Sequence, residues 1–212
     1  TNNGLVTQML SAGNLKNTGN VVTTNTTVLN TLSTLTNSGT ISSTGQLLVN
    51  ASGNIENNGT LKATNALNVT AGGNLKTTKG SALLSDNQLV AAATGNIDHG
   101  GTIKAVNTLV TFAGDTLKVS GNIYADDNLV LQAKKDDSLT SGEITHSGTL
   151  SGSNITVQTI GDRMSIETDL ATGRLFKLQD RAPERAFAAA RLPYQPQCFT
   201  GPQLQADITH SM

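Results

Sequence analysis

The sequence predicts an all-β protein whose chain winds into a parallel β-helix, a solenoid of about seven coils, followed by an irregular, partly helical tail. Three observations lead to this fold class: a repeat of about twenty residues, a two-residue alternation of apolar and polar positions, and an unusual composition. Apolar residues make up 36%, aromatic residues 3% and charged residues 14% of the 212 residues. Thr, Asn, Ser and Gly fill the difference, and they favour turns and sheet surfaces over helix interiors.

The repeat occupies residues 1–160. Segment 52–71 reads SGNIENNGTLKATNALNVTA, and segment 94–113 reads TGNIDHGGTIKAVNTLVTFA. Aligned repeats produce three apolar columns. The first column comprises Leu15, Leu35, Ile55, Leu75, Ile97 and Leu117. The second comprises Val21, Ile41, Leu61, Ile103 and Ile123, with an irregular block at 76–81 interrupting it. The third comprises Leu29, Leu47, Leu67, Leu89, Leu109 and Leu129.

Apolar residues alternate with polar ones inside each repeat, as at Leu61 and Ala63 and then at Leu67, Val69 and Ala71. A period of two indicates β-strands, and the Gly and Asn residues between them mark turns. Three short strands with bends at fixed offsets describe one triangular coil. Because a single coil buries too little apolar surface to stand alone, the coils must stack on one another. Roughly seven coils rising ~4.8 Å each predict a rod ~34 Å long.

Asparagine also recurs at fixed positions of the repeat. One predicted corner holds Asn14, Asn54, Asn74 and Asn96, and another holds Asn65, Asn87 and Asn107. Asn tolerates the tight backbone of a turn and forms hydrogen bonds to the same position one coil away. We interpret both sets as structural corner ladders rather than as binding residues.

The composition changes at residue 161, and residues 161–212 form a separate, non-repeat tail. All five Arg and all four Pro residues lie in this tail. The segment from Ala182 to Arg191, with Pro183 near its start and Pro193 beyond its end, predicts a short helix. Three interpretations of the tail remain open: a cap on the solenoid, a dangling extension, and a foreign sequence produced by truncation.

Charge and cysteine content exclude several classes of protein. A formal net charge of -1 gives no electrostatic case for nucleic acid or an anionic membrane. No apolar run is long enough for a transmembrane helix. The first residues resemble neither a signal peptide nor a translation start, which indicates a segment of something longer. A single cysteine, Cys198, allows no internal disulfide.

Parallel β-helices also include polysaccharide lyases and hydrolases, which gather carboxylates on one outer face. The candidates here are Asp86, Asp126 and Asp127. In the repeat register Asp86 and Asp126 are equivalent positions two coils apart, and Val106 separates them. This gap predicts solvated corner residues rather than a catalytic cluster.

Histidine and cysteine provide no recognisable chemistry. His99, His146 and His210 lack metal-ligand spacing, and we expect them to be exposed turn residues. Cys198 has no nucleophile context. We therefore predict no catalytic, cofactor-binding or metal-binding residues and no cofactor.

The block G-N-I-x-N-x-G-T-I-x-A, at residues 53–63 and 95–105, resembles the repeats of the filamentous haemagglutinin family. That family includes exported adhesins and the stalks of contact-dependent growth-inhibition toxins. The resemblance covers about residues 1–160. It implies a right-handed parallel β-helix, export through an outer-membrane partner transporter, and display on a bacterial surface. The secretion-domain and toxin-junction motifs of the family are not found in this sequence.

Three hypotheses for function follow, and the first is favoured. It is a non-enzymatic segment of a secreted, surface-displayed adhesin, a rod that contacts receptors or glycans on host or neighbouring cells. The second is a stalk segment of a contact-dependent growth-inhibition exoprotein. The third is a polysaccharide-cleaving β-helix enzyme.

Overall fold

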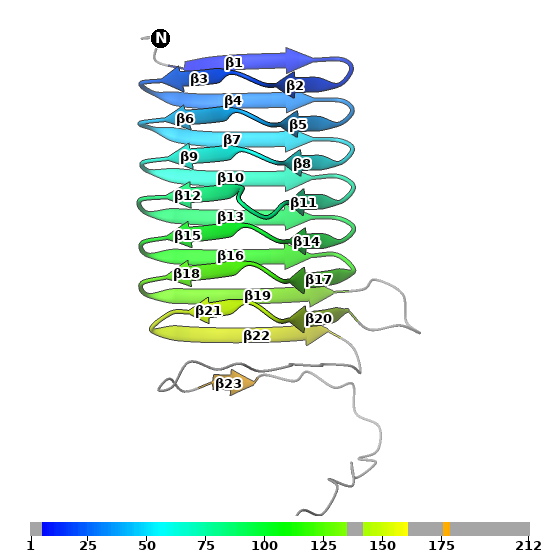
Figure 1. The fold of residues 1–212 in the computed structure, drawn as a ribbon, viewed down its shortest axis with the longest axis vertical. Coiled ribbons are helices and arrows are strands. Elements are labelled where there is room, and N and C mark those ends of the chain that lie inside the picture. Colours follow the sequence, from blue (N-terminus) through cyan, green and yellow to red (C-terminus); the bar gives the residue numbers. More distant parts are fainter. Residues whose placement is uncertain (1–5, 135–141, 161–175, 179–212) are drawn as a thin grey trace, which may run out of the picture.

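The computed structural model describes residues 6–134, 142–160 and 176–178, and every regular element among them is a β-strand. These strands form three parallel sheets that run the length of a solenoid, as Figure 1 shows. The all-β, parallel-solenoid prediction is confirmed. The helix expected at 182–191, Cys198 and His210 lie outside the described residues.

The widest sheet, which we call the long sheet, is built from the longest strand of each coil. Its strands in spatial order are β1 (Val6–Ser11), β4 (Thr26–Thr31), β7 (Gln46–Ala51), β10 (Ala66–Ala71), β13 (Gln88–Ala93), β16 (Thr108–Ala113), β19 (Asn128–Lys134), β22 (Asn154–Ile160) and β23 (Phe176–Leu178). The last strand, β23, pairs with β22 through three residues.

Two narrower sheets complete the triangle. The first short sheet comprises β2 (Leu15–Asn17), β5 (Leu35–Asn37), β8 (Ile55–Asn57), β11 (Leu75–Thr77), β14 (Ile97–His99), β17 (Thr116–Val119) and β20 (Glu143–His146). The second short sheet comprises β3 (Asn20–Thr23), β6 (Thr40–Ser43), β9 (Thr60–Ala63), β12 (Ala82–Ser85), β15 (Thr102–Ala105), β18 (Asn122–Ala125) and β21 (Thr149–Ser151).

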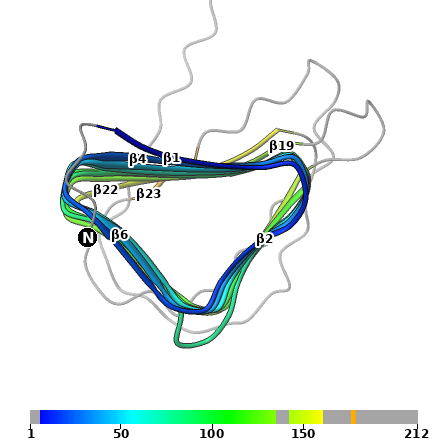
Figure 2. The ribbon, with the colours of Figure 1, turned by 90° about the horizontal axis from the view of Figure 1, so that it is seen from above.

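Each coil therefore contributes one strand to each sheet, and the described residues supply seven strands to each of the two short sheets. The cross-section is triangular, as Figure 2 shows. The buried apolar side chains of all three sheets belong to one core cluster. Seen from the N-terminal end, the chain runs clockwise as it recedes (Figure 2), so the winding is right-handed.

The core consists of apolar side chains stacked coil over coil. Leu35 pairs with Ile55, and Ile55 with Leu75, in one continuous parallel register. The same register continues through Ile97 and Leu117. The exposed fraction of each of these side chains is 1% or less. Burial on this scale stabilises by about 1.5–3 kcal/mol per large aliphatic side chain, and it is complete only because coils lie above and below.

Two details of the predicted columns differ from the structure. Leu29 was assigned to the column of Leu47, but it pairs with Val49, and the residue that pairs with Leu47 is Thr27. Both Leu29 and Thr27 point inward, because residues two apart on a strand share a face, so alternation alone does not separate them. Leu83, absent from the predicted second column, pairs with both Leu61 and Ile103 and fills its gap.

The irregular block at 76–81 is an insertion at the corner between the two short sheets. Strand β11 ends at Thr77 and β12 begins at Ala82, and the extra residues bulge outward (Figure 2). A turn in which the Ser81 amide donates to the Thr78 carbonyl closes this bulge at 3.0 Å. Gly80 has a φ of 87°, a left-handed conformation that suits glycine. The 22-residue step from Leu75 to Ile97 thus leaves the core register intact.

The ordinary corner between the short sheets is so tight that successive coils touch backbone to backbone. A Cβ added at Gly39, Gly59, Gly121 or Gly148 would overlap the carbonyl oxygen of the glycine one coil before it. None of these glycines has positive φ, so close approach rather than backbone freedom selects glycine here.

Gly59→Ala is therefore expected to destabilise the solenoid by about 1–3 kcal/mol, because the corner must separate to admit a methyl group. Gly13→Ala is the matched control, because no atom lies within 4 Å of its added Cβ. We expect this substitution to change the free energy of unfolding by at most about 0.5 kcal/mol. Urea unfolding followed by far-UV circular dichroism measures both. Equal effects of the two substitutions would contradict the close-approach explanation.

Candidate functional site

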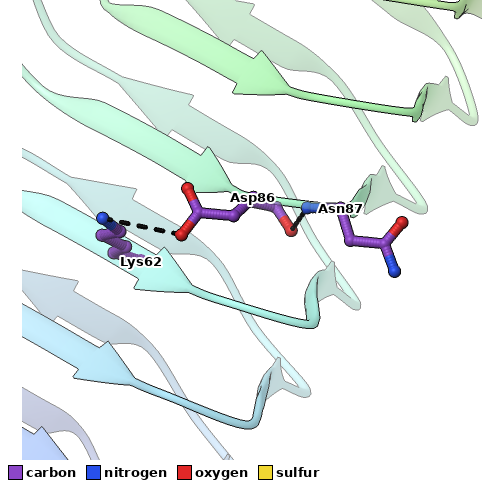
Figure 3. A network of polar contacts seen from close by, with 4 residues as sticks. Lys62, Asp86 and Asn87 are labelled. Carbon is purple, nitrogen blue, oxygen red and sulfur yellow. Dashed lines mark hydrogen bonds and ion pairs between the residues drawn. The ribbon is translucent and has the colours of Figure 1, made fainter.

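The carboxylates considered for catalysis lie at the corner between the second short sheet and the long sheet. The Lys62 ammonium lies 3.8 Å from the Asp86 carboxylate, as Figure 3 shows, and both side chains are about half exposed. The Asp126 amide donates to the Val106 carbonyl, which places Val106 between the two aspartates as the repeat register requires. Coils spaced ~4.8 Å apart leave Asp86 and Asp126 ~10 Å apart. Exposed ion pairs of the Lys62–Asp86 kind contribute about 0–1 kcal/mol.

No cluster of three or more His, Cys, Asp or Glu side chains suitable for a metal ion occurs in the described ranges. Apart from the Lys62–Asp86 pair and the ring of His99, the side-chain contacts that the structure describes in these ranges join hydroxyls, side-chain amides and backbone groups.

The expectation that His99 and His146 are exposed turn residues is wrong. Their exposed fractions are 0% and 7%, and both occupy the last inward position of a strand of the first short sheet. The Thr77 hydroxyl lies 2.5 Å from His99 Nδ1, and the Asn122 carbonyl oxygen lies 3.2 Å from His99 Nε2. Because a carbonyl only accepts, Nε2 carries the proton of the neutral ring and Nδ1 accepts from the threonine hydroxyl.

Burial lowers the pKa of His99, and hydrogen bonds to backbone groups of Asn122 and Gly101 together with the nearby Asp98 charge oppose this only in part. The folded protein therefore keeps the ring neutral at a pH where the unfolded chain takes up a proton. The contribution of His99 to stability is fully present above the ordinary histidine pKa near 6.5 and falls as the pH drops below it.

We expect the free energy of unfolding to fall between pH 7 and pH 5 in the native chain, by an amount that His99→Asn removes. Asparagine is the natural replacement, because Asn37 and Asn57 occupy this position in other coils. Urea titrations of both proteins at several pH values test this. Identical pH profiles would show that His99 titrates alike in the folded and unfolded states.

The position of His99 belongs to a buried polar column that sequence reasoning missed. Asn17 donates through Nδ2 to Asn37 Oδ1 at 2.8 Å, and Asn37 donates in the same way to Asn57 Oδ1 at 2.8 Å. Both Asn37 and Asn57 are completely buried. The sequence does contain a sign of this column, because an asparagine precedes the corner glycine by two residues in the recurring pattern Asn-x-Gly. We did not interpret that pattern as a ladder of buried asparagines.

The predicted corner asparagines lie on the outside of the solenoid. Oδ1 of Asn54 accepts from the backbone amide of Asn74, and Oδ1 of Asn74 accepts from that of Asn96, each at 2.8 Å. Oδ1 of Asn14 similarly accepts from the amide of Thr34 at 3.2 Å. These contacts join side chain to backbone, not amide to amide.

The second predicted corner contains one direct amide pair. Asn107 donates through Nδ2 to Asn87 Oδ1 at 2.6 Å. Asn65 contributes through its backbone, because its amide donates to the Gly45 carbonyl at 3.1 Å. The role of both sets as structural ladders remains our proposal.

Charge is distributed unevenly over the three outer faces. On the first short sheet the outward residues alternate in sign from coil to coil, as Glu56, Lys76, Asp98 and Lys118. On the long sheet, the outward residues from Gln8 to Gln158 that the structure describes are uncharged apart from Lys134 at the end of β19. Among the described residues, the solenoid therefore presents one face that is nearly free of charge and two faces that carry several charges.

A family model described as the haemagglutinin repeat matches residues 2–76, 63–121 and 110–163. The chain belongs to the haemagglutinin-repeat family. The three matched segments overlap, and together they span the solenoid that the structure describes. The haemagglutinin-repeat family is a structural adhesin family rather than an enzyme family, and it is secreted or surface-associated.

Two further comparisons give no match for this haemagglutinin-repeat chain, one with the curated proteins and one with the solved structures. In the part of the chain that the structure describes, no helix has the length and apolarity needed to cross a membrane.

Proposed function

We propose that this haemagglutinin-repeat chain is a segment of a secreted adhesin that acts as a rod on a bacterial surface and contacts receptors or glycans of other cells. The observation that carries the proposal is the unbroken parallel register of the stacked coils, with threonine, asparagine and glutamine repeated along the outside. A rigid segment with many similar polar positions can extend away from the bacterial surface and can form many weak contacts with receptors or glycans.

The contact mechanism follows from the chemistry of these outward groups. Asparagine and glutamine amides both donate and accept hydrogen bonds, as sugar hydroxyls do. One such contact is weak in water, because it replaces a hydrogen bond to solvent. Repetition at strand spacing converts weak contacts into firm attachment, because each further contact forms at high effective concentration. Export through an outer-membrane partner transporter belongs to the same proposal.

The test is binding of the purified chain, coupled to beads at low and high surface density, to host cells, extracellular matrix and neighbouring bacteria. The proposal expects binding that rises steeply with density and is competed poorly by the soluble chain. Beads that carry the core variant Leu67→Lys, in which the solenoid is disrupted, are the control. No binding to any of these preparations at high density would reduce the segment to a spacer.

A further inference from the structure

The three sheets do not end at the same level of the solenoid. The long sheet continues past β22 to β23, whereas the two short sheets end one coil earlier, at β20 and β21 (Figure 1). Strand β23 pairs with β22 in the parallel register of the other coils, with Phe176 opposite Ile155 and Leu178 opposite Val157. A parallel pair requires the chain to return from the end of β22 to the start of β23. Among the described residues, no strand pairs with β20 or β21 on this side.

The inner side of β20 is better covered than an edge strand by itself allows. Ile144, on β20, has an exposed fraction of 1%. Leu15, its counterpart on the opposite edge strand β2, is only partly buried. In the second short sheet the two edges are alike, because Leu150 and Val21 are both partly buried. The contrast indicates that chain beyond the described strands covers Ile144, and Leu150 has surface left to bury.

The segment between β22 and β23 has the length of one coil. Residues 161–175, fifteen in number, connect these two strands. In the ordinary coils fourteen residues connect successive long strands, as at 32–45 and 52–65, and the coil with the bulge uses sixteen, at 72–87. Fifteen residues therefore suffice for two short strands and the corners between them.

The sequence of this segment repeats the spacing of the core. In the ordinary coils, the first inward residues of the three strands follow one another at intervals of six. Two coils show this spacing with Ile55, Leu61 and Leu67, and with Ile97, Ile103 and Leu109. Met164, Leu170 and Phe176 follow at the same intervals. An eighth set of core positions is therefore present in the sequence.

The second inward position of each strand lies two residues further on. In the segment these positions hold Ile166, Thr172 and Leu178. The column that Thr172 would join, in the second short sheet, contains only small residues in the other coils. They are Thr23, Ser43, Ala63, Ser85, Ala105 and Ala125. Threonine agrees with this column in size.

The corner glycine is the position at which the segment departs from the pattern. Gly148 and its equivalents leave no room for a Cβ, because the backbone of the preceding coil is too close. Thr168 takes this position in the segment. The bulged coil has already replaced the glycine, because Ser81 occupies the equivalent position below Gly101 and the chain turns outward there (Figure 2). A threonine fits a corner that is widened in this way, and the terminal repeats of solenoids typically differ from the others.

We propose that residues 161–175 form one further coil, which docks on the open edges of β20 and β21 and covers this end of the solenoid. Met164 lies over Ile144 in the first short sheet, and Leu170 lies over Leu150 in the second. The repeat therefore extends past residue 160, where the composition changes. The proposal does not rest on the adhesive function, because it concerns only what pairs with two strand edges.

Backbone hydrogen bonds provide the other part of this contact. In three successive coils, the amide of the first inward residue of the first short strand donates to a carbonyl of the next coil at 2.9 Å. These pairs are Leu35 to Asn54, Ile55 to Asn74 and Leu75 to Asn96. The equivalent donor on β20 is the Ile144 amide, and Arg163 carries the equivalent acceptor. An open sheet edge is a template for pairing, and a segment of the same chain reaches it at a higher effective concentration than another molecule does.

Pairs of cysteines test the register in the full chain with Cys198→Ser. Thr145→Cys/Ser165→Cys joins outward positions of the first short sheet, and Ser151→Cys/Ala171→Cys joins those of the second. Each pair lies one strand spacing apart, ~4.8 Å between Cα atoms, which a disulfide spans. The matched controls exchange the partners, as Thr145→Cys/Ala171→Cys and Ser151→Cys/Ser165→Cys. We expect the matched pairs to link within one chain at least about ten times faster than the exchanged pairs.

Tryptic peptides and non-reducing electrophoresis measure this linkage. Trypsin cleaves after Arg163, so each intramolecular disulfide joins two separate peptides. Exchanged pairs that link as fast as matched pairs would show a segment without register, and the proposal would be overturned. Linkage between two chains would overturn it as well, because a second copy would then occupy the edges. Failure of both matched pairs to link has the same consequence.

Hydrogen exchange tests the covering of β20 and β21 without any cross-link. Leu170→Lys puts a charge at a proposed inward position, and Ala171→Lys puts the same charge at the neighbouring outward position. We expect Leu170→Lys to speed amide exchange in residues 143–151 at least about tenfold, because the added coil no longer protects them, and Ala171→Lys to leave it unchanged. Exchange in β13 should be the same in all three proteins, which shows that the rest of the solenoid is folded. Equal exchange of residues 143–151 in the native chain and both variants would overturn the proposal.

Discussion

Leu67→Lys is expected to abolish the folded solenoid, whereas Asn68→Lys on the same strand leaves it folded. Leu67 has an exposed fraction of 0% and pairs with Leu47 and Leu89 in the core, while the side chain of Asn68 points outward. A lysine ammonium buried without a partner costs several kcal/mol, which is comparable to the whole stability of about 5–15 kcal/mol of a typical domain. Both substitutions introduce a lysine, at neighbouring positions of one strand, and they differ in the face on which the lysine lies.

Far-UV circular dichroism and thermal unfolding measure the effect. The Leu67→Lys chain should lack the β-sheet spectrum or lose it in a broad transition at lower temperature, because each coil depends on its neighbours. Asn68→Lys should change the free energy of unfolding by no more than about 0.5 kcal/mol. If both lysines are tolerated equally, the strand does not have one inner and one outer face, and the parallel solenoid is the wrong fold.

Asn57→Leu is expected to cost about 2–4 kcal/mol, although leucine has nearly the same size and the site is completely buried. The Asn57 amide accepts from Asn37 and donates to the carbonyls of Gly59 and Ala82, at 3.0 and 3.2 Å. Leucine replaces none of these contacts, and each buried polar group left without a partner costs about 1–3 kcal/mol. Part of the loss is offset because the Ala82 amide still donates to the Gly59 carbonyl.

Asn50→Leu is the control for this prediction, because Asn50 also forms an amide ladder but on the outer face. Its Nδ2 donates to Asn30 Oδ1 at 2.9 Å, and both side chains are partly exposed to water. Because water replaces the lost hydrogen bond, we expect the free energy of unfolding to change by at most about 0.5 kcal/mol. Chemical unfolding of the two variants gives the comparison. A cost for Asn57→Leu no larger than that for Asn50→Leu would show that the buried ladder is not a source of stability.

Much of this fold could be predicted because a solenoid repeats its constraints. Ile55 and Leu75 recur twenty residues apart, and a period of two within each block identifies the inner face, so column and strand follow from spacing alone. The assignment of Leu29 failed because Thr27 and Leu29 share a face, and an apolar side chain was preferred where the structure places a threonine. Leu83 was missed because the inserted corner shifts the count by two.

The polar interior was harder to predict from the sequence. Asn is usually found on the surface and His is intermediate, and only the fold reveals that the corner between the short sheets buries Asn37, Asn57 and His99. Their burial requires hydrogen bonds to the coils on either side, which a sequence read one repeat at a time does not display. The scarcity of charge on the outer face of the long sheet was equally hidden, since it appears only when the outward positions of separated strands are placed side by side.

The bulge at residues 78–81 has a consequence for how such chains change over time. It shows that a coil can gain length at its rim while Leu75 and Leu83 still align with the coils on either side. The number of coils and the length of the turn between the short sheets can therefore change independently. Whole coils can be duplicated or exchanged in frame, and residues can be inserted at this turn, while the buried apolar residues stay the same. The same bend is a natural place to graft an epitope.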